Sequence, residues 1–119
     1  MSARPTAVHP ILPVADVAKA CAHYEALGFR AQNWDDGADY AFVARGDVEL
    51  HLTHRPTSYY PADGIAVIYL DVDDADALYA EWADQPGETQ HPHDMPWGMH
   101  EGVHIDPDGN VIRFGHPIG

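Results

Sequence analysis

The chain repeats one order of predicted elements, and this internal repeat constrains its fold more than any other feature of the 119 residues. In each half an apolar extended segment leads to an aspartate that can cap a helix, as Val14-x-Asp16 in the first half and Val72-x-Asp74 in the second. Apolar segments able to pair as strands follow each helix. The repeat therefore predicts an α+β protein, a single domain built from two tandem βαβββ modules.

The first module is expected over 1–60. Pro10 and Pro13 favour an edge strand, or a strand that crosses to a partner. Cys21 falls on the apolar face of the helix, where it is expected to be buried as a small apolar residue. The expected elements are a strand over 8–14, a helix from Asp16 to Gly28, a strand over 29–34, a turn at Asp35-Asp36-Gly37 and hairpin strands over 40–45 and 48–53.

The second module is expected over 61–119. Its helix begins after Asp73 or Asp74 and places Trp82 where the first helix has Tyr24. The other expected elements are a strand over 65–70, a long polar loop with one short strand over 85–98, and closing strands over 103–105 and 111–114. Two such modules predict a curved mixed sheet around a shared cleft, which is the default ligand site.

The composition limits the classes of function. The formal charge is −13, from 19 acidic and 6 basic residues, so no positive patch is visible that would bind nucleic acid through its phosphates. Such an acidic surface favours solubility or attracts cationic partners. No apolar run approaches the roughly 20 residues of a membrane span, and no signal peptide is visible. Together with the single cysteine, these features predict a cytoplasmic protein with no membrane partner.

Short motifs that are informative about the family occur along nearly the whole chain. They are Leu12-Pro13-Val14-x-Asp16-Val17, Leu27-Gly28-Phe29, Arg45-Gly46-Asp47, Leu78-Tyr79-Ala80-Glu81-Trp82, Pro96-Trp97-Gly98-Met99-His100-Glu101 and Asp106-Pro107-Asp108-Gly109-Asn110-Val111-Ile112-Arg113-Phe114. Together they resemble bleomycin resistance proteins, which belong to the vicinal oxygen chelate superfamily with glyoxalase I and the extradiol dioxygenases. The resemblance implies a homodimer in which the first strand crosses to the partner subunit, with a hinge near Pro10.

The resemblance also implies where a metal ion would be held. The superfamily's enzymes bind a divalent ion through four side chains on strands that line the cleft. His9 and His51 lie near the first two positions, but an apolar residue at or near Val67 stands at the third and Arg113 at the fourth. Arginine cannot bind a metal ion, and two histidines alone make a weak site. We therefore expect no metal site, no cofactor and no catalytic residue.

The resemblance implies instead a groove for an antibiotic at the dimer interface. In bleomycin-binding members the flat part of the drug lies between aromatic side chains, and Trp97 and Tyr40 match these positions. Tyr40 can equally be a strand aromatic packed on the core, and the acidic members of the set can be solvated turn residues. The expected ligand-binding residues are Trp34, Tyr40, His51, Tyr59, Tyr60, Asp63, Trp97, Met99 and Glu101, with Asp35-Asp36 as further anions.

The remaining histidines predict little chemistry. His91-Pro92-His93 lies in a polar stretch and would bind a metal ion only adventitiously. His100 and His104 alternate along one strand and are expected on its exposed face. The chain shows neither a glycine-rich phosphate loop nor a nucleophile with a base at a recognisable spacing.

The sequence thus predicts a non-enzymatic, dimeric protein that sequesters a flat, cationic antibiotic of the bleomycin group, free or metal-loaded. One alternative is a metal-dependent lyase or dioxygenase that uses His9, His51 and a third ligand. Another is a relative with the same fold that binds a different small molecule, because fold alone does not fix function. Metal analysis of the purified protein separates the enzyme from the binding protein.

Overall fold

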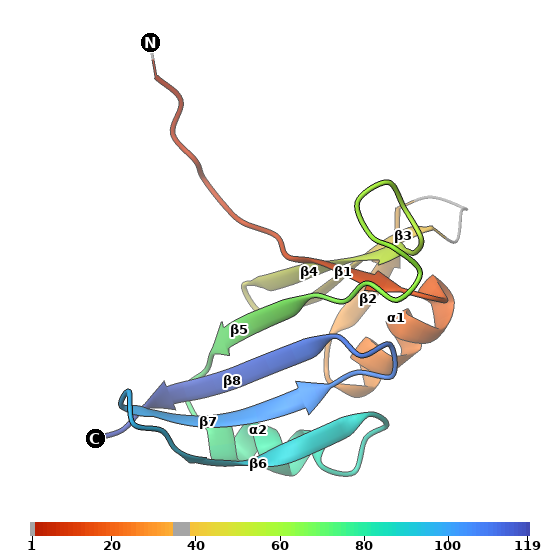
Figure 1. The fold of residues 1–119 in the computed structure, drawn as a ribbon. Coiled ribbons are helices and arrows are strands. Elements are labelled where there is room, and N and C mark those ends of the chain that lie inside the picture. The colour runs from red at the N-terminus through yellow and green to blue at the C-terminus, as the bar shows by residue number, and fades with distance from the viewer. Residues whose placement is uncertain (1, 35–38) are drawn as a thin grey trace.

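A computed structural model describes residues 2–34 and 39–119, and it contains two βαβββ modules (Figure 1). The first module consists of β1 (Ile11–Val14), α1 (Val17–Ala26), β2 (Arg30–Asn33), β3 (Tyr40–Arg45) and β4 (Val48–His54). The second consists of β5 (Val67–Asp71), α2 (Ala75–Trp82), β6 (Glu88–Asp94), β7 (Met99–Ile105) and β8 (Val111–Pro117). The predicted α+β class and the repeat are confirmed, and the turn predicted at 35–37 lies outside the described residues.

Each module forms its own four-stranded mixed sheet, with the strand order β1-β4-β3-β2 in the first and β5-β8-β7-β6 in the second. In both sheets the first strand runs parallel to the last strand of its module. The register also repeats, since Ile11 faces His51 in the first sheet and Tyr69 faces Arg113 in the second. β1 is an edge strand of its sheet, as Pro10 and Pro13 predict, and only Pro13 lies within it.

Both helices begin at the predicted aspartates. The Asp16 carboxylate accepts a hydrogen bond of 3.0 Å from the backbone N–H of Lys19, and Asp74, rather than Asp73, does the same for Ala77. Gly28 follows the end of α1 with a φ of 94°, a conformation that glycine adopts without strain. The local capping signals in the sequence therefore fix both helix starts.

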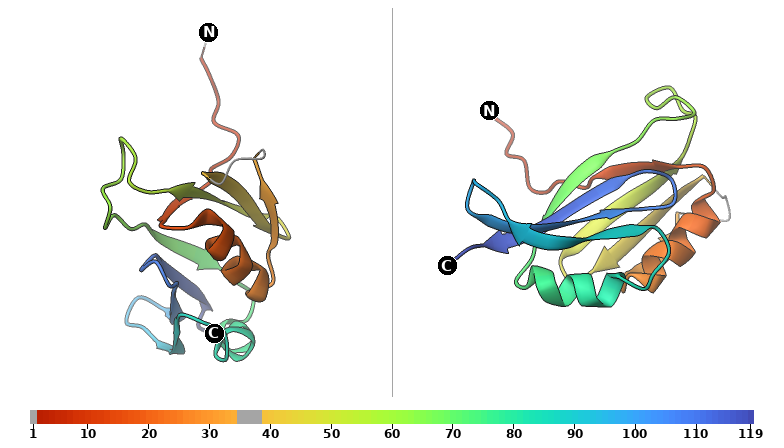
Figure 2. Two further views of the ribbon diagram at one scale, coloured as in Figure 1. Left: turned by 90° about the vertical axis from the view of Figure 1, so that its right-hand side faces the viewer. Right: turned by 60° about the horizontal axis from the view of Figure 1, so that its bottom comes forward.

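The two helices lie next to each other along one side of the molecule, below the strands in the right-hand view of Figure 2. Their equivalent aromatic residues tie the modules together. The Trp82 indole N–H donates to the backbone oxygen of Leu27, and the Tyr24 hydroxyl donates to Asp106 at 2.7 Å. Both rings are fully buried, so each module completes the core of the other.

The turn between β7 and β8 makes a second junction between the modules. Asn110 is fully buried, and its amide donates to the Asp106 carboxylate and to the backbone oxygen of Pro13 in β1. Arg55 donates to the same Pro13 oxygen and to the oxygen of Asp108. The predicted turn chemistry thus also holds the start of the first module against the end of the second.

A buried histidine pair lies at the junction and corrects one prediction. His104 in β7 is fully buried rather than exposed, because its ring points to the helix side of the sheet. Its Nε2 lies 2.9 Å from Nε2 of His23 in α1, and the two rings stack. His100, by contrast, is hydrogen-bonded near the surface to Asp94 and Asp76.

Several predicted strand boundaries are wrong. The stretch predicted as a long polar loop with one short strand contains a longer strand, the seven-residue β6, which pairs with β7 through a register shift between Gln90 and His93. That irregularity accommodates a buried Pro92 inside a strand. β7 and β8 are longer than predicted because they pair over their full length.

Residues 2–10, which we call the N-terminal arm, precede β1; the arm extends away from the first module towards its free end, while His9 and Pro10 still lie beside β4 (Figure 1). The strand predicted from residue 8 begins only at Ile11. Among residues 2–34 and 39–119, no helix is long and apolar enough to cross a membrane.

Candidate functional site

The face of the first sheet that α1 does not cover carries the first group of candidate residues. Side chains alternate along a strand, so Val43 and Leu50 pack into the core while their neighbours point the other way. Phe42 in β3 pairs with His51 in β4, and the two rings meet edge to face with centroids 4.8 Å apart. This open face is therefore aromatic and partly exposed.

A cavity of about 600 Å³ opens at one end of this face. It is lined by Ile11, Tyr40, Thr53, Thr57, Ser58, Tyr59 and Tyr60. Tyr59 is 89% exposed, whereas Tyr60 is half-buried and its hydroxyl donates to the backbone oxygen of Ile11. Three of the residues predicted to bind ligand, Tyr40, Tyr59 and Tyr60, thus come together in one cavity.

His51 lies beside this cavity and contacts it through Tyr40. The Tyr40 hydroxyl is 2.8 Å from Nδ1 of His51. Partial burial raises the pKa of Tyr40, so its hydroxyl keeps its proton at neutral pH. The hydroxyl can donate to the imidazole or accept from it, depending on which ring nitrogen carries hydrogen.

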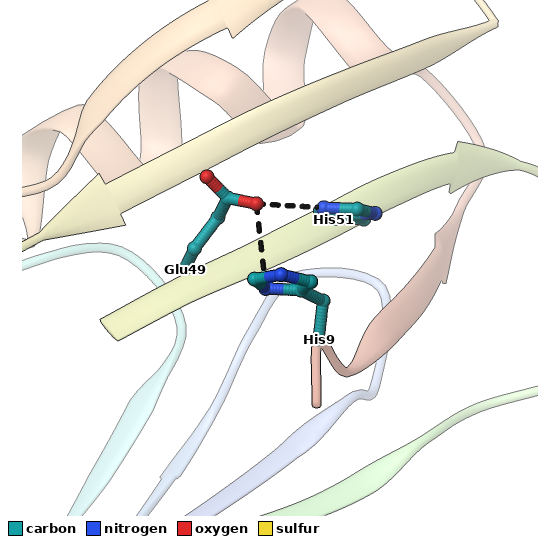
Figure 3. Close-up of side chains that lie close together, drawn as sticks. All are labelled: His9, Glu49 and His51. Atoms are coloured by element: carbon teal, nitrogen blue, oxygen red, sulfur yellow. Dashed lines mark hydrogen bonds and ion pairs between the residues drawn. The ribbon is translucent and has the colours of Figure 1, made fainter. Parts of the chain in front are cut away.

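A carboxylate completes a three-residue cluster with His51. The Glu49 Oε2 atom lies 3.0 Å from Nε2 of His51 and 3.3 Å from Nδ1 of His9 on the N-terminal arm (Figure 3). The two imidazole rings are stacked, with centroids 5.1 Å apart. Glu49 is absent from the residues that the sequence predicts, although its spacing of two from His51 on a strand indicates a shared face.

The second group of candidate residues lies on the open face of the second sheet. Glu101 in β7 is 1% exposed, and its carboxylate accepts hydrogen bonds from the Trp97 indole at 2.6 Å and from the Tyr69 hydroxyl at 3.2 Å. Arg113 donates to the other carboxylate oxygen at 2.8 Å. The Arg113 guanidinium also lies near the rings of Tyr69 and Trp97, 5.4 and 5.9 Å from their centroids.

Charge explains how Glu101 is tolerated in this position. Burial alone would raise the pKa of the Glu101 carboxyl, but the hydrogen bonds from Trp97 and Arg113 and the charge of Arg113 outweigh burial and lower that pKa. Glu101 is therefore ionised at neutral pH and fixes the edge of the Trp97 ring, while the Trp97 side chain remains 59% exposed.

The other predicted residues lie apart from these two groups. Trp34 follows β2 and is 67% exposed. Asp63 is exposed in the segment between the modules, and Met99 is half-buried at the start of β7. Asp35-Asp36 lies outside the described residues. The predicted set is thus divided between two sheets rather than gathered in one cleft.

The four-ligand metal arrangement that the resemblance implies does not fit this chain. His9 and His51 lie side by side as expected, but the equivalent strands of the second sheet present Val67, which is 62% exposed, and Arg113. Neither side chain can donate an electron pair to a metal ion. No step of a reaction is therefore assigned to an ion held between the two sheets.

A larger cavity of about 700 Å³ lies between the modules on the helix side. Its lining includes Asp47, Asp71 and Asp74 together with the ion pair between Arg45 and Glu81. None of the predicted ligand-binding residues lines this cavity, whereas Tyr40, Tyr59 and Tyr60 line the smaller aromatic cavity on the first sheet.

Solved structures of other proteins share this fold. A bleomycin-binding protein from bleomycin-producing Streptomyces verticillus, in complex with copper(II)-bleomycin, is 27% identical, with a TM-score of 0.75 and 99% of each chain covered. A bleomycin resistance determinant encoded on the transposon Tn5 is 24% identical, with a TM-score of 0.75 and coverage of 95% and 98% of the two chains. A lactoylglutathione lyase from Agrobacterium tumefaciens is 21% identical, with a TM-score of 0.73 and 95% of each chain covered.

No curated protein gave a significant sequence match. The family comparison covers almost the whole chain, since residues 6–114 match the family described as the Glyoxalase/Bleomycin resistance protein/Dioxygenase superfamily. This match includes both modules, both open sheet faces and the cluster around Glu49. The chain belongs to the Glyoxalase/Bleomycin resistance protein/Dioxygenase superfamily.

Proposed function

We propose that the chain binds a flat, cationic antibiotic of the bleomycin group and holds it stoichiometrically, so that the drug cannot reach DNA. The observation that carries this proposal is the aromatic cavity on the first sheet, in which Tyr40, Tyr59 and Tyr60 meet. The similarity to a bleomycin-binding protein over almost the full length supports the same ligand class.

In this proposal two aromatic side chains hold the flat part of the drug by stacking on it. Tyr40 stacks on one side of a flat ring and Trp97 on the other, and each offset stack contributes about 0.5–1.5 kcal/mol beyond the burial of area. The hydrogen bond from Trp97 to Glu101 holds the indole before the ligand arrives, which lowers the entropy cost of binding. The formal charge of −13 speeds the encounter with a cation.

The site requires two subunits in this proposal. Tyr40 and Trp97 lie on the open faces of different sheets, and a two-fold dimer can bring the first sheet of one subunit to the second sheet of the other. The N-terminal arm, in which Val8 is 85% exposed, is available to cross to the partner with Pro10 as its hinge. Sedimentation equilibrium tests this point, and a monomer at micromolar concentration would contradict it.

Calorimetry and tryptophan fluorescence test the ligand. We expect bleomycin, metal-free or metal-loaded, to release heat and quench fluorescence at micromolar protein. Trp97→Ala should weaken binding by more than about 1 kcal/mol. Ile118→Ala, which removes an exposed apolar side chain near the C-terminus, is the control and should bind like the native chain. Absence of both heat and quenching would contradict the proposal.

The second candidate is a metal-dependent enzyme of the same superfamily, of the glyoxalase or dioxygenase type. The specific observation in its favour is that Glu49 supplies a third potential ligand beside His9 and His51. Stoichiometric metal in the purified protein together with chemical alteration of a substrate would favour this candidate. Binding of a different small molecule, without turnover and without affinity for bleomycin, would favour the third candidate, a relative with the same fold and another ligand.

A further inference from the structure

We propose that the cavity at the end of the first sheet is a site for an uncharged saccharide, either a free sugar or the sugar of a glycosylated ligand. Six of the seven residues that line this cavity of about 600 Å³ carry a hydroxyl group, and the seventh is Ile11. The inference deepens the proposed function, on which it rests for the glycosylated ligand only, because Tyr40, which stacks on the flat part of the drug, lines the same cavity.

The lining of the cavity is uncharged although the chain as a whole is strongly charged. The chain has 19 acidic and 6 basic residues, yet among the described residues no Asp, Glu, Lys, Arg or His lines this cavity. A charged group that entered it would lose hydration without meeting a counter-ion in the lining. The charged end of a cationic drug therefore stays outside, and the cavity fits a group whose polar atoms are hydroxyls.

Tyrosine rings supply the apolar part of such a site. Tyr59 is 89% exposed and Tyr60 is half-buried, and both line the cavity. The carbon–hydrogen bonds on one face of a sugar ring carry a small positive charge and pack against the negative face of an aromatic ring. An aromatic surface with hydroxyl groups at its margin thus matches a sugar, which has an apolar face and polar edges.

The hydroxyl groups of the cavity divide into donors and acceptors. Thr57 Oγ1 accepts the backbone N–H groups of Tyr59 and Tyr60, each at 3.1 Å, which leaves the Thr57 hydroxyl the part of a donor. The Tyr60 hydroxyl donates to the backbone oxygen of Ile11 at 3.2 Å, so its oxygen remains able to accept. Each hydroxyl of a sugar both donates and accepts, and it finds both kinds of partner here.

Hydrogen bonds build this wall of the cavity before a ligand arrives. The backbone N–H of Thr57 donates to the oxygen of Tyr60 at 2.7 Å and closes a tight loop. Arg55 fastens both ends of the surrounding segment, since its backbone N–H donates to the oxygen of Val14 and its side chain donates to the oxygen of Gly64, each at 2.9 Å. A wall that is already ordered lowers the entropy cost of binding a small ligand.

Saturation-transfer nuclear magnetic resonance on the full chain tests the site with free sugars. We expect transfer from the protein to methyl mannoside or methyl glucoside at millimolar concentration, and little transfer to methoxytetrahydropyran, the same ring without hydroxyls. Tyr59→Ala should lower the glycoside affinity about fivefold, whereas Tyr59→Phe, which keeps the ring, should retain most of it. Tyr60→Phe should lower it about two- to tenfold through the lost acceptor. Ser2→Ala, which removes an exposed hydroxyl on the arm, is the control and should bind like the native chain.

Calorimetry with two forms of the drug separates the two sources of the sugar. If the cavity takes the sugar of a glycosylated ligand, bleomycin should bind at least about tenfold more tightly than the same drug without its disaccharide. Equal binding of the two forms, together with transfer to glycosides, shows a cavity for free sugars. If neither form binds, the proposed function fails, and the glycosides alone decide this inference.

Two negative results together would overturn the saccharide site. The first is no transfer to either glycoside, or equal transfer to the ring without hydroxyls. The second is no preference for the glycosylated drug. Binding of the drug would then stand without a sugar site, so the failure of this inference is distinguishable from the failure of the proposed function.

Discussion

At the scale of single residues, Gly115 in β8 shows how closely the second site is packed. A side chain at this position would collide with the Tyr69 hydroxyl and would lie 2.9 Å from the backbone oxygen of His100. Tyr69 is in turn one of the three donors to the buried Glu101 carboxylate. The absence of a side chain at residue 115 therefore permits the hydrogen-bond network that holds Trp97.

We predict that Gly115→Ala lowers the free energy of unfolding by about 1–3 kcal/mol, the usual cost of overpacking, and weakens ligand binding with it. Urea denaturation gives the first quantity and fluorescence titration the second. In a Tyr69→Phe background, which lacks the hydroxyl, part of the loss should be recovered. An unchanged unfolding midpoint in Gly115→Ala would contradict this account.

The site was only partly predictable at this scale. Tyr40 was identifiable from the family resemblance, and Tyr59 and Tyr60 from the turn-rich segment in which they lie. In the structure all three line one cavity. Glu49 was missed although its spacing of two from His51 on one strand indicates a shared face, whereas the role of Tyr69 depends on an arrangement of strands that the sequence leaves open. Glu101 was identifiable as an anion, but its near-complete burial follows from Trp97, Tyr69 and Arg113 closing over it.

At the scale of elements, the two helices follow from local signals and the strands of the second module do not. Asp16 and Asp74 mark the helix starts because capping involves only neighbouring residues. The sequence predicts only a short strand in the region of β6, and not its bounds, since the polar side chains and Pro92 lack the alternation of a strand. β6 forms because β7 offers a partner edge on both sides of the register shift between Gln90 and His93.

The choice between two adjacent aspartates gives a sharp test of this view. Asp74→Ala should cost about 1 kcal/mol of unfolding free energy, because the first turn of the eight-residue α2 loses its cap. Asp73→Ala, the matched control, should cost less than half as much. Urea denaturation of both variants measures the difference, and equal effects would show that the cap does not determine where α2 begins.

At the scale of the whole molecule, the modules are joined by buried polar contacts as well as by the shared core. Thr89 donates to the backbone oxygen of Trp82, so Nδ1–H of His104 donates to Thr89 and Nε2 accepts from His23. Burial, and to a smaller extent the proximity of His23, lowers the pKa of His104 to about 4. Burial also lowers the pKa of His23, although Asp106 and Asp108 oppose this shift.

We therefore predict that acid weakens the junction. The unfolded chain binds protons at these histidines below about pH 6.5 and the folded chain does not, so the free energy of unfolding falls as the pH drops from about 6.5 towards 4. Each histidine held neutral contributes a slope of up to about 1.4 kcal/mol per pH unit.

Urea denaturation from pH 7.5 to 4.5 measures this dependence. His100→Gln is the useful background, because hydrogen bonds from Asp76 and Asp94 raise the pKa of His100 and give it the opposite dependence on pH. Nuclear magnetic resonance should show the His104 ring uncharged at pH 5.5. Stability that does not change over this range, or a His104 ring that titrates near pH 6.5, would refute the prediction.

The proposed capture of a drug is tested most directly by titrating a fixed amount of bleomycin with the protein and measuring cleavage of plasmid DNA. The account predicts that cleavage stops when chains and drug are present in equal amounts, and that denaturing the complex returns chemically unaltered, active drug. Protection by far less than one chain per drug molecule with an altered product, or full cleavage in the presence of excess protein, would contradict it.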